Sequence, residues 1–318
     1  MMEKLIITAA ICGAEVTKEN SPAVPYTVEE MVREAKSAYD AGAAVIHVHV
    51  RWDDGTPTQD RERFRVVLDA IKAACPGVIL IPSTGGATGM TPEERLQPTE
   101  LFPEMATLDC GTCNFGDDIF VNDMPTMWAF GQRMIENHIK PEYECFEIGH
   151  LDTILNMAKK GLVPGAPMQF NFVLGVSGCT PTVGNLNYLV KQIPSGSTWT
   201  VTGIGRSAWD MAAAGIVMGG NVRVGLRTTS TWARATRPPP TVSWWPRWYA
   251  SPRSWAARSP TPARPAGSCP WPKRRMSAAY PLKDRTICNE QEGENYETEK
   301  IFSAYSRGSH EPGSFLRL

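Results

Sequence analysis

Short aliphatic runs alternate with longer amphipathic segments over the first two-thirds of the chain. The short runs have the length and β-branched content of buried strands, and the longer segments place apolar residues at helical spacing. Eight strands are therefore predicted, at residues 4–13, 45–50, 78–84, 105–111, 141–148, 168–175, 198–205 and 221–226. Helices are predicted between them, at residues 27–41, 61–74, 124–137, 152–160, 182–192 and 209–218, with another beginning near residue 91.

This alternation predicts an α/β fold. Eight short strands separated by helices, with no hairpin turns between them, favour a parallel sheet closed as a (β/α)8 TIM barrel. A doubly wound open sheet is the alternative. No Gly-x-Gly-x-x-Gly follows the first predicted strand, which argues against a dinucleotide-binding version of that sheet.

The pattern stops at residue 227. Residues 227–275 are dense in Pro, Arg, Trp, Ser and Ala, and neither the helical nor the strand period survives there. We therefore predict a barrel domain at residues 1–226, a disordered out-of-frame segment at 227–275, and a polar tail of unknown role at 276–318. An ordinary disordered tail fits poorly, because such segments are poor in tryptophan and this one contains six.

A frameshift explains the change of composition. If residues 227–231 are assigned the codons AGG-ACA-ACA-TCT-AC, one added G in front makes the same bases read Glu-Asp-Asn-Ile-Tyr. Residues 243–249 and 251–263 likewise yield amphipathic sequences in another frame, of the kind that a last barrel helix requires. Sequencing the natural gene again tests the hypothesis, and an intact frame across residues 226–227 would remove it.

Two histidines stand in the second predicted strand, in the run Val-Ile-His-Val-His-Val at residues 45–50. Side chains two apart on a strand point to the same face, so His47 and His49 should project together. A polar loop follows, which places the pair at the carboxyl end of its strand, where the active sites of (β/α)8 barrels lie. Two neutral imidazoles on one face can supply half of a zinc site; the alternative is a hydrogen-bonded pair in the barrel core.

Composition narrows the classes of function. The chain has 318 residues, 42% of them hydrophobic, and a net charge of −1. That balance gives no electrostatic footprint for nucleic acid or a membrane surface, and no apolar run approaches the ~20 residues of a spanning helix. The amino terminus runs into the first predicted strand without the features of a signal peptide. The eight cysteines show no framework spacing, which suits a reducing cytoplasm.

Several motifs together resemble one family, the β-keto acid cleavage enzymes, whose founding member is 3-keto-5-aminohexanoate cleavage enzyme. The motifs are the His-x-His strand, Cys-Gly-Ala-Glu-Val-Thr-Lys at residues 12–18, Pro-Ser-Thr-Gly-Gly at 82–86, Gly-Ile-Gly-Arg at 203–206 and Val-Arg-Val-Gly-Leu at 222–226. The resemblance spans residues 4–226. It implies a barrel, usually oligomeric, that holds a divalent metal, normally zinc.

The resemblance also implies a reaction and a metal site. The family condenses a β-keto acid with acetyl-CoA to give acetoacetate and a new CoA thioester, and its founding member points to lysine fermentation. His47 and His49 are implied as zinc ligands. The family's third ligand is a Glu directly after Val-Gly-Leu, followed by an Asp that acts in proton transfer, but this chain has Arg227 and Thr228 there. Neither can replace a carboxylate, whereas the alternative frame restores Glu-Asp at these positions.

Other roles carry over by position. Glu15 and Ser83 resemble substrate contacts of the family, and Thr107 is a further substrate-binding candidate that could equally belong to the core. Arg223 resembles the family's catalytic cationic residue near the thioester and the metal. Arg206, which follows two glycines at a strand end, could bind a CoA phosphate or cap its loop.

Three hypotheses follow. The first is a zinc-dependent β-keto acid cleavage enzyme with acetyl-CoA as co-substrate, impaired in this chain because the third ligand and the base are missing. The second is a barrel metal hydrolase that uses the same histidines, and the third is a frameshifted product without function. The expected partners are small molecules and, if the chain folds correctly, further copies of itself; no nucleic-acid or membrane partner is expected.

Overall fold

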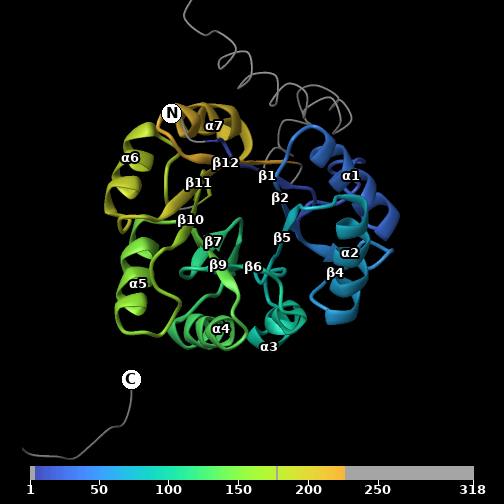
Figure 1. The fold of residues 1–318 in the computed structure, drawn as a ribbon, viewed down its shortest axis with the longest axis horizontal. Coiled ribbons are helices and arrows are strands. Elements are labelled where there is room, and N and C mark those ends of the chain that lie inside the picture. The colour runs from blue at the N-terminus through green and yellow to red at the C-terminus, as the bar shows by residue number, and fades with distance from the viewer. Residues whose placement is uncertain (1–3, 177, 226–318) are drawn as a thin grey trace, which may run out of the picture. The chain divides into compact units, whose positions relative to one another are not determined.

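Eight parallel strands form a ring with helices outside it in the computed structural model, which describes residues 4–176 and 178–225 (Figure 1). The strands of the ring are β1 (Ile7–Ala10), β2 (Val45–Val48), β5 (Ile79–Pro82), β6 (Met105–Asp109), β9 (Lys140–Cys145), β10 (Gln169–Leu174), β11 (Thr198–Gly203) and β12 (Asn221–Val224). Their order is β5-β2-β1-β12-β11-β10-β9-β6, with parallel pairing throughout. The predicted (β/α)8 barrel is therefore confirmed.

The two ends of that order, β5 and β6, meet through side chains. The N–H of Thr84 donates to the hydroxyl of Thr107 over 2.9 Å, and the Thr84 hydroxyl donates to the Thr107 carbonyl over 2.6 Å. Both threonines are fully buried. Because buried backbone groups at a strand edge need hydrogen-bond partners, this pair stabilises the junction at which the ring closes.

The helices cover the outside of the ring (Figure 1). They are α1 (Val28–Asp40), α2 (Arg61–Ala74), α3 (Pro92–Leu96), α4 (Met124–Glu136), α5 (Ile148–Lys159), α6 (Val183–Gln192) and α7 (Ala208–Val217), with the 3-10 turns η1 (Gln97–Leu101) and η2 (Gly205–Ser207). Thr27 and Glu30 form the expected capping box at the start of α1. The helix predicted near residue 91 is only five residues long and continues directly as the turn η1, because Pro98 has no N–H with which to extend the α-helical hydrogen bonds.

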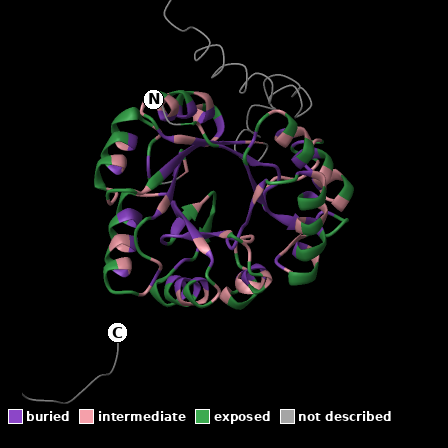
Figure 2. Ribbon diagram, in the orientation of Figure 1, coloured by how far each residue is buried: buried purple, intermediate pink, exposed green. Residues whose placement is uncertain are grey.

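Buried residues follow the strands and the inward faces of the helices, and exposed residues lie on the outward faces (Figure 2). Apolar side chains fill the layer between strands and helices; in α1, Met31, Ala35 and Ala38 belong to this core. The inside of the ring differs. There Arg223 of β12 contacts two glutamates of β9, a strand that is not its neighbour in the sheet, so charged side chains occupy the centre of the barrel.

The prediction that no hairpin interrupts the pattern is wrong. Two antiparallel hairpins follow strands of the ring: β3 (Val50–Arg51) pairs with β4 (Pro57–Thr58), and β7 (Cys113–Phe115) pairs with β8 (Asp118–Phe120). Their strands are too short to show alternation in the sequence. The run at residues 45–50, predicted as one strand, is correspondingly divided at His49.

Among the described residues, no helix combines the length and the apolar character needed to cross a membrane. The predicted domain boundary at residue 226, and the segments predicted at 227–275 and 276–318, lie outside the described residues.

Candidate active site

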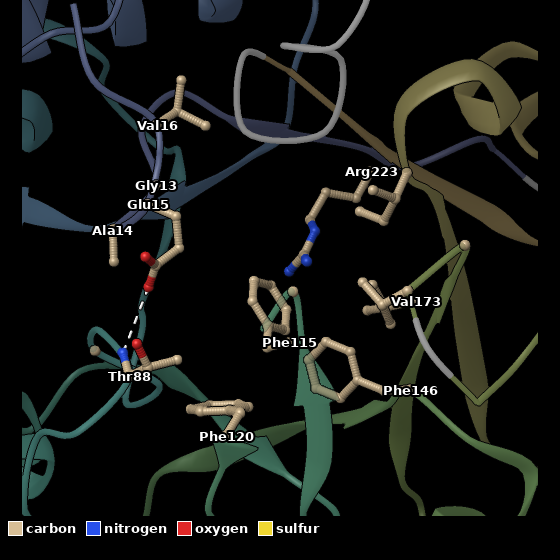
Figure 3. A pocket seen from close by; sticks show the side chains of 15 residues that line it. Gly13, Ala14, Glu15, Val16, Thr88, Phe115, Phe120, Phe146, Val173 and Arg223 are labelled. Carbon is tan, nitrogen blue, oxygen red and sulfur yellow. Dashed lines mark hydrogen bonds between the residues drawn. The ribbon is translucent and has the colours of Figure 1, made fainter. Parts of the chain in front are cut away.

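A cavity of about 390 Å³ opens at the carboxyl ends of the barrel strands (Figure 3). Its walls come from Arg223 of β12, from β10, and from the segments that follow β1, β5, β6, β9, β10 and β11. This is the end of a (β/α)8 barrel at which active sites are found. Two of the predicted site residues, Glu15 and Arg223, line the cavity.

Glu15 and Arg223 come from separate elements of the barrel mouth. Glu15 lies on the loop after β1, and its Oε1 accepts a hydrogen bond from the backbone N–H of Thr88 over 3.4 Å (Figure 3). This contact joins the loop after β1 to the loop after β5. The guanidinium of Arg223 points into the cavity from β12.

Aromatic rings form another side of the cavity. Phe115 and Phe120 belong to the β7–β8 hairpin, and Phe146 follows β9. Their ring centroids lie 6.0, 6.1 and 6.3 Å apart in edge-to-face arrangements, the geometry that aromatic quadrupoles favour. The hairpin that the sequence did not indicate therefore supplies much of the apolar wall.

Arg95 of α3 supports the aromatic side from within the protein. Its side chain is 3% exposed, and its guanidinium carbon lies 4.9 Å from the centroid of the Phe120 ring. Burial lowers the pKa of Arg95, and the nearby carboxylate of Asp109 acts in the opposite direction. Its hydrogen bonds run to the carbonyls of Thr84 and Val121 and to the side chains of Asn122 and Asp109.

A buried charge cluster lies inside the ring. Arg223 Nη1 donates a hydrogen bond to Glu144 and lies 3.6 Å from Oε2 of Glu142. The three side chains are between 1% and 2% exposed. One guanidinium thus faces two carboxylates, and the cluster has an excess of one negative charge when both glutamates are ionised.

Two neutral side chains fix the orientation of Glu144. Asn171 Nδ2 donates to Glu144 Oε1 over 3.3 Å, and the hydroxyl of Thr202 donates to Asn171 Oδ1 over 2.7 Å. Because the hydroxyl occupies the amide oxygen, the NH2 group of Asn171 must face the carboxylate. The position of Arg223 is therefore set by a chain of polar contacts that runs through β9, β10 and β11.

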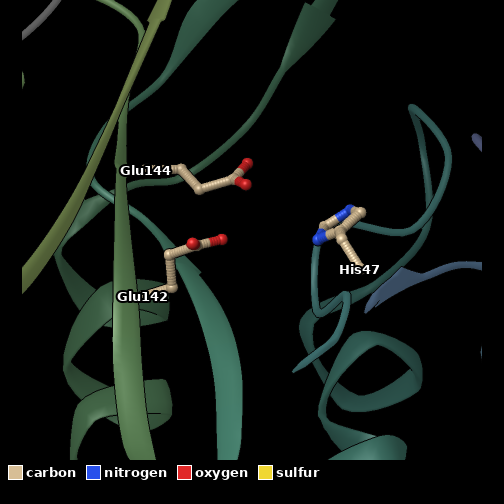
Figure 4. Close-up of side chains that lie close together, drawn as sticks. All are labelled: His47, Glu142 and Glu144. Atoms are coloured by element: carbon tan, nitrogen blue, oxygen red, sulfur yellow. The ribbon is translucent and has the colours of Figure 1, made fainter. Parts of the chain in front are cut away.

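His47 of β2 faces the two glutamates across the ring (Figure 4). A ring nitrogen of His47 and one carboxylate oxygen each of Glu142 and Glu144 lie within 4.8 Å of one another. His49 is close by, with its ring centroid 5.1 Å from that of His47. Both imidazoles are buried, at 0% and 2% exposure.

The chemistry of these donors suits a divalent metal. Imidazole nitrogen and carboxylate oxygen are both ligands of zinc, and a dication would offset the negative charge that Arg223 leaves uncompensated. The predicted ligand pair is His47 and His49, and the structure adds Glu142 and Glu144 as the carboxylates near His47. Residue 227, where the resemblance implies a third ligand in related proteins, lies outside the described residues.

The remaining predicted site residues are not among those that line the cavity. Ser83 directly follows β5 and is buried, and its hydroxyl accepts a hydrogen bond from the Gly85 N–H over 3.2 Å. Thr107 makes the contacts with Thr84 that join β5 to β6. Arg206 is exposed in the turn η2, two residues after Ile204 of the cavity wall.

Sequence reasoning missed Glu142 and Glu144, although a signal was present. Glu-Tyr-Glu in β9 has the same alternate spacing as His-Val-His, in a strand whose residues after Lys140 are all buried. Two carboxylates on one face of a buried strand are costly unless they are paired or bind a cation, and this could have drawn attention to them. Asn171 and the phenylalanines of the wall carry no comparable signal, because their roles depend on partners distant in the sequence.

Comparison with known proteins gives a consistent result. The family model for beta-keto acid cleavage enzymes matches residues 4–241. Proteins described as 3-keto-5-aminohexanoate cleavage enzyme, from Fusobacterium nucleatum subsp. nucleatum and Acetoanaerobium sticklandii, are 63% and 62% identical over 227 residues, covering 71% of this chain and 83% of each relative. A 3-oxoadipate:acetyl-CoA acetyltransferase from Cupriavidus necator is 35% identical over 230 residues, covering 71% of this chain and 80% of that protein.

A solved structure supports the fold. The ternary complex of ObcA with a C4-CoA adduct and oxalate superimposes with a TM-score of 0.63 at 17% identity, covering 75% of this chain and 65% of that chain, slightly less than two-thirds of its length. The likeness extends to the arrangement of strands and helices only. The family model, in contrast, matches more than half of this chain, and relatives at over 60% identity cover 71% of it. The chain therefore belongs to the family of β-keto acid cleavage enzymes.

Proposed function

We propose that this protein is a metal-dependent enzyme that condenses a β-keto acid, such as 3-keto-5-aminohexanoate, with acetyl-CoA. The products are acetoacetate and a new acyl-CoA. The observation that carries the proposal is the cavity at the carboxyl end of the barrel, into which Glu15 and Arg223 reach, in a chain 63% identical to a named cleavage enzyme. His47 and its neighbouring carboxylates lie inside the same ring of strands.

The reaction exchanges acyl groups and balances without another reactant. The bond between the keto carbon and the neighbouring CH2 of the keto acid breaks, and that CH2 forms a bond to the acetyl carbon of acetyl-CoA. The CoA sulfur takes the acyl group that is left. A divalent metal bound by His47 and His49 would supply Lewis-acid stabilisation of negative charge on the keto oxygen.

Arg223 stabilises negative charge at the thioester carbonyl. Its guanidinium points into the cavity and is held by Glu144, which is itself oriented by Asn171. A charge that is fixed before the substrate arrives needs no reorganisation as the reaction proceeds, which is the basis of electrostatic catalysis. Glu142 and Glu144 keep this charge in place and contribute to the electrostatic balance of the metal site.

Two of the other predicted residues bind the keto acid. Glu15 contacts it from the loop after β1, and Ser83 contacts its carboxylate, whereas Thr107 supports this region through its hydrogen bonds with Thr84. Arg206 is exposed in the turn η2, just before α7, where it can reach a CoA phosphate outside the cavity. The protein acts in the cytoplasm as a homo-oligomer.

The chain as printed is impaired. Arg227 and Thr228 occupy the positions of the metal-binding Glu and the proton-transferring Asp of the family, and an arginine has no lone pair to give a metal. A version whose reading frame is restored from residue 227 regains both carboxylates. The two proteins therefore make a natural comparison for assay.

The test is to incubate both versions with acetyl-CoA and a panel of β-keto acids and to measure acetoacetate, with zinc content determined in parallel. We expect turnover by the frame-restored protein and at least a hundredfold less by the printed chain. His47→Ala should lower zinc content, whereas His138→Asn, at an exposed histidine before β9, should not. Absence of acetoacetate from both versions would contradict the proposal, and release of CoA without consumption of any keto acid would favour a hydrolase.

A further inference from the structure

Arg51 is a second buried guanidinium, separate from the charge cluster. It ends the short strand β3 and is 1% exposed. Burying a cation is costly unless its charge and its N–H groups are compensated. The hydrogen-bond partners of Arg51 therefore show which part of the protein this buried cation stabilises.

Arg51 binds backbone carbonyl groups. Four of its five hydrogen bonds run to the loop after β1: Nε and Nη2 donate to the Gly13 carbonyl over 3.1 and 2.7 Å, and Nη2 also donates to the carbonyls of Ala14 and Val16 over 2.6 and 2.9 Å. Nη1 donates to the carbonyl of Gly55, at the turn of its own hairpin, over 2.5 Å.

The carbonyls of Gly13, Ala14 and Val16 belong to the loop on either side of Glu15. Gly13, Ala14, Glu15 and Val16 all line the cavity. A planar guanidinium with five N–H groups can hold several carbonyls in a fixed arrangement, whereas a lysine ammonium acts as a point charge with three donors. The loop that carries Glu15 is thus fixed by one side chain from the β3–β4 hairpin, which follows β2.

The surroundings of Arg51 prevent it from turning to another partner. Its guanidinium carbon lies 5.2 Å from the centroid of the Tyr26 ring, and a Cβ at Gly55 would lie 2.3 Å from that same ring. Gly55 has a φ of +94°, so a glycine satisfies both the turn and the close approach. The hairpin therefore presents Arg51 to the loop in one geometry.

We propose that Arg51 is a positioning residue, whose guanidinium fixes residues 13–16 so that the carboxylate of Glu15 reaches the substrate cavity. The part of this inference that concerns substrate rests on the proposed function. The part that concerns the loop rests on the hydrogen bonds alone. Arg63 provides a matched control, because it donates to the carbonyls of Arg51 and Tyr26 and not to residues 13–16.

The first measurement is hydrogen exchange in the full chain, without ligand. Arg51→Lys should accelerate amide exchange across residues 11–17 at least tenfold, and Arg63→Lys should change it less than twofold. Unchanged exchange in Arg51→Lys would overturn the proposal. If Arg51→Lys does not fold, Arg51→Gln, which keeps one amide donor for the Gly13 carbonyl, is measured in its place.

The second measurement asks whether Arg51 acts through Glu15. The dissociation constant of acetoacetate is determined by titration calorimetry, with zinc present, for the frame-restored protein and for its Arg51→Lys, Glu15→Gln and double variants. We expect each single change to alter the constant at least fivefold, and Arg51→Lys to alter it less than twofold when Glu15→Gln is already present. If the fold-change in the dissociation constant of the double variant equals the product of the two single fold-changes, Arg51 acts independently of Glu15. If the frame-restored protein without these substitutions binds no acetoacetate, the proposed function fails, and the exchange result alone decides whether Arg51 fixes the loop.

Discussion

The cavity has a charged side and an aromatic side, and the two are stabilised by different means. On the charged side, Arg223 and Glu144 are buried and each depends on the other. On the aromatic side, Phe120 and Phe146 pack edge to face, and their stabilisation scales with buried area and fit. Removing a group should therefore leave an uncompensated charge on the first side and only an empty volume on the second.

Each side is also supported by a buried arginine that donates to backbone carbonyls and contacts an aromatic ring. Arg51 binds carbonyls of the loop that carries Glu15, so it fixes a polar segment by hydrogen bonds. Arg95 lies beside the Phe120 ring and also reaches Asp109, so it combines a stacking contact with an ion pair. The comparison indicates that positions on the charged side tolerate substitution least.

The largest effect is expected at Arg223. Arg223→Met leaves Glu142 and Glu144 buried without their cation, which should lower the free energy of unfolding by about 3–5 kcal/mol. Urea denaturation at neutral pH measures the loss. Adding Glu144→Gln to this variant should recover part of it, and a double variant no more stable than Arg223→Met would show that charge compensation is not the cause.

Substitutions on the aromatic side should lower stability less, and apolar replacements of similar volume should be tolerated there. Phe146→Ala should cost about 3 kcal/mol, because a 1% exposed ring is replaced by a cavity. Phe146→Leu, which keeps most of the volume, should cost less than about 1.5 kcal/mol. Thermal denaturation compares the two variants, and equal losses would mean that the wall depends on ring geometry more than on volume.

The sequence was sufficient to predict the fold and to single out the two histidines inside the ring, but not the two glutamates that face them. Alternating runs predicted all eight strands of the ring, because buried parallel strands read as continuous aliphatic segments. His47 and His49 were visible because histidine is unusual in such a run. Glu142 and Glu144 have the same spacing and were overlooked, because their meaning depends on Arg223, which is distant in the sequence.

The cavity walls were much less predictable. Phe115 and Phe120 lie in a hairpin whose strands have three residues each, so no period marks them. Arg51 and Arg95 read as ordinary polar residues, because their burial follows from carbonyls and rings supplied by other elements. Local patterns therefore predicted the elements, whereas the contacts between elements required the structure.

A smaller effect is expected at the junction between the two sides. Thr107→Val removes the acceptor for the buried Thr84 N–H, which should lower the free energy of unfolding by about 2 kcal/mol. Thr107→Ser keeps the hydroxyl and serves as the control. We expect acetoacetate affinity to change less than twofold; a clear loss of affinity without a loss of stability would instead support the predicted substrate contact.

The smallest effect is a dependence of stability on pH that arises on the aromatic side. His150 packs against Phe146, its Nδ1 accepts a hydrogen bond from the Phe146 N–H, and its Nε2 donates to the Thr112 carbonyl. Burial lowers the pKa of His150 from its usual 6.5, although the Thr112 contact and Glu147 act in the opposite direction.

Because the folded-state pKa of His150 lies below the unfolded value, the unfolded chain binds the proton first as pH falls. This stabilising contribution is therefore complete above about pH 6.5 and is lost as pH decreases through the folded-state pKa. Protonating Nδ1 would also remove the acceptor for the Phe146 N–H, so acidification should loosen the aromatic wall. Urea denaturation between pH 7.5 and 5 should show a steeper loss of stability in the unsubstituted protein than in His150→Gln. Equal slopes would show that His150 is not the source of the acid sensitivity.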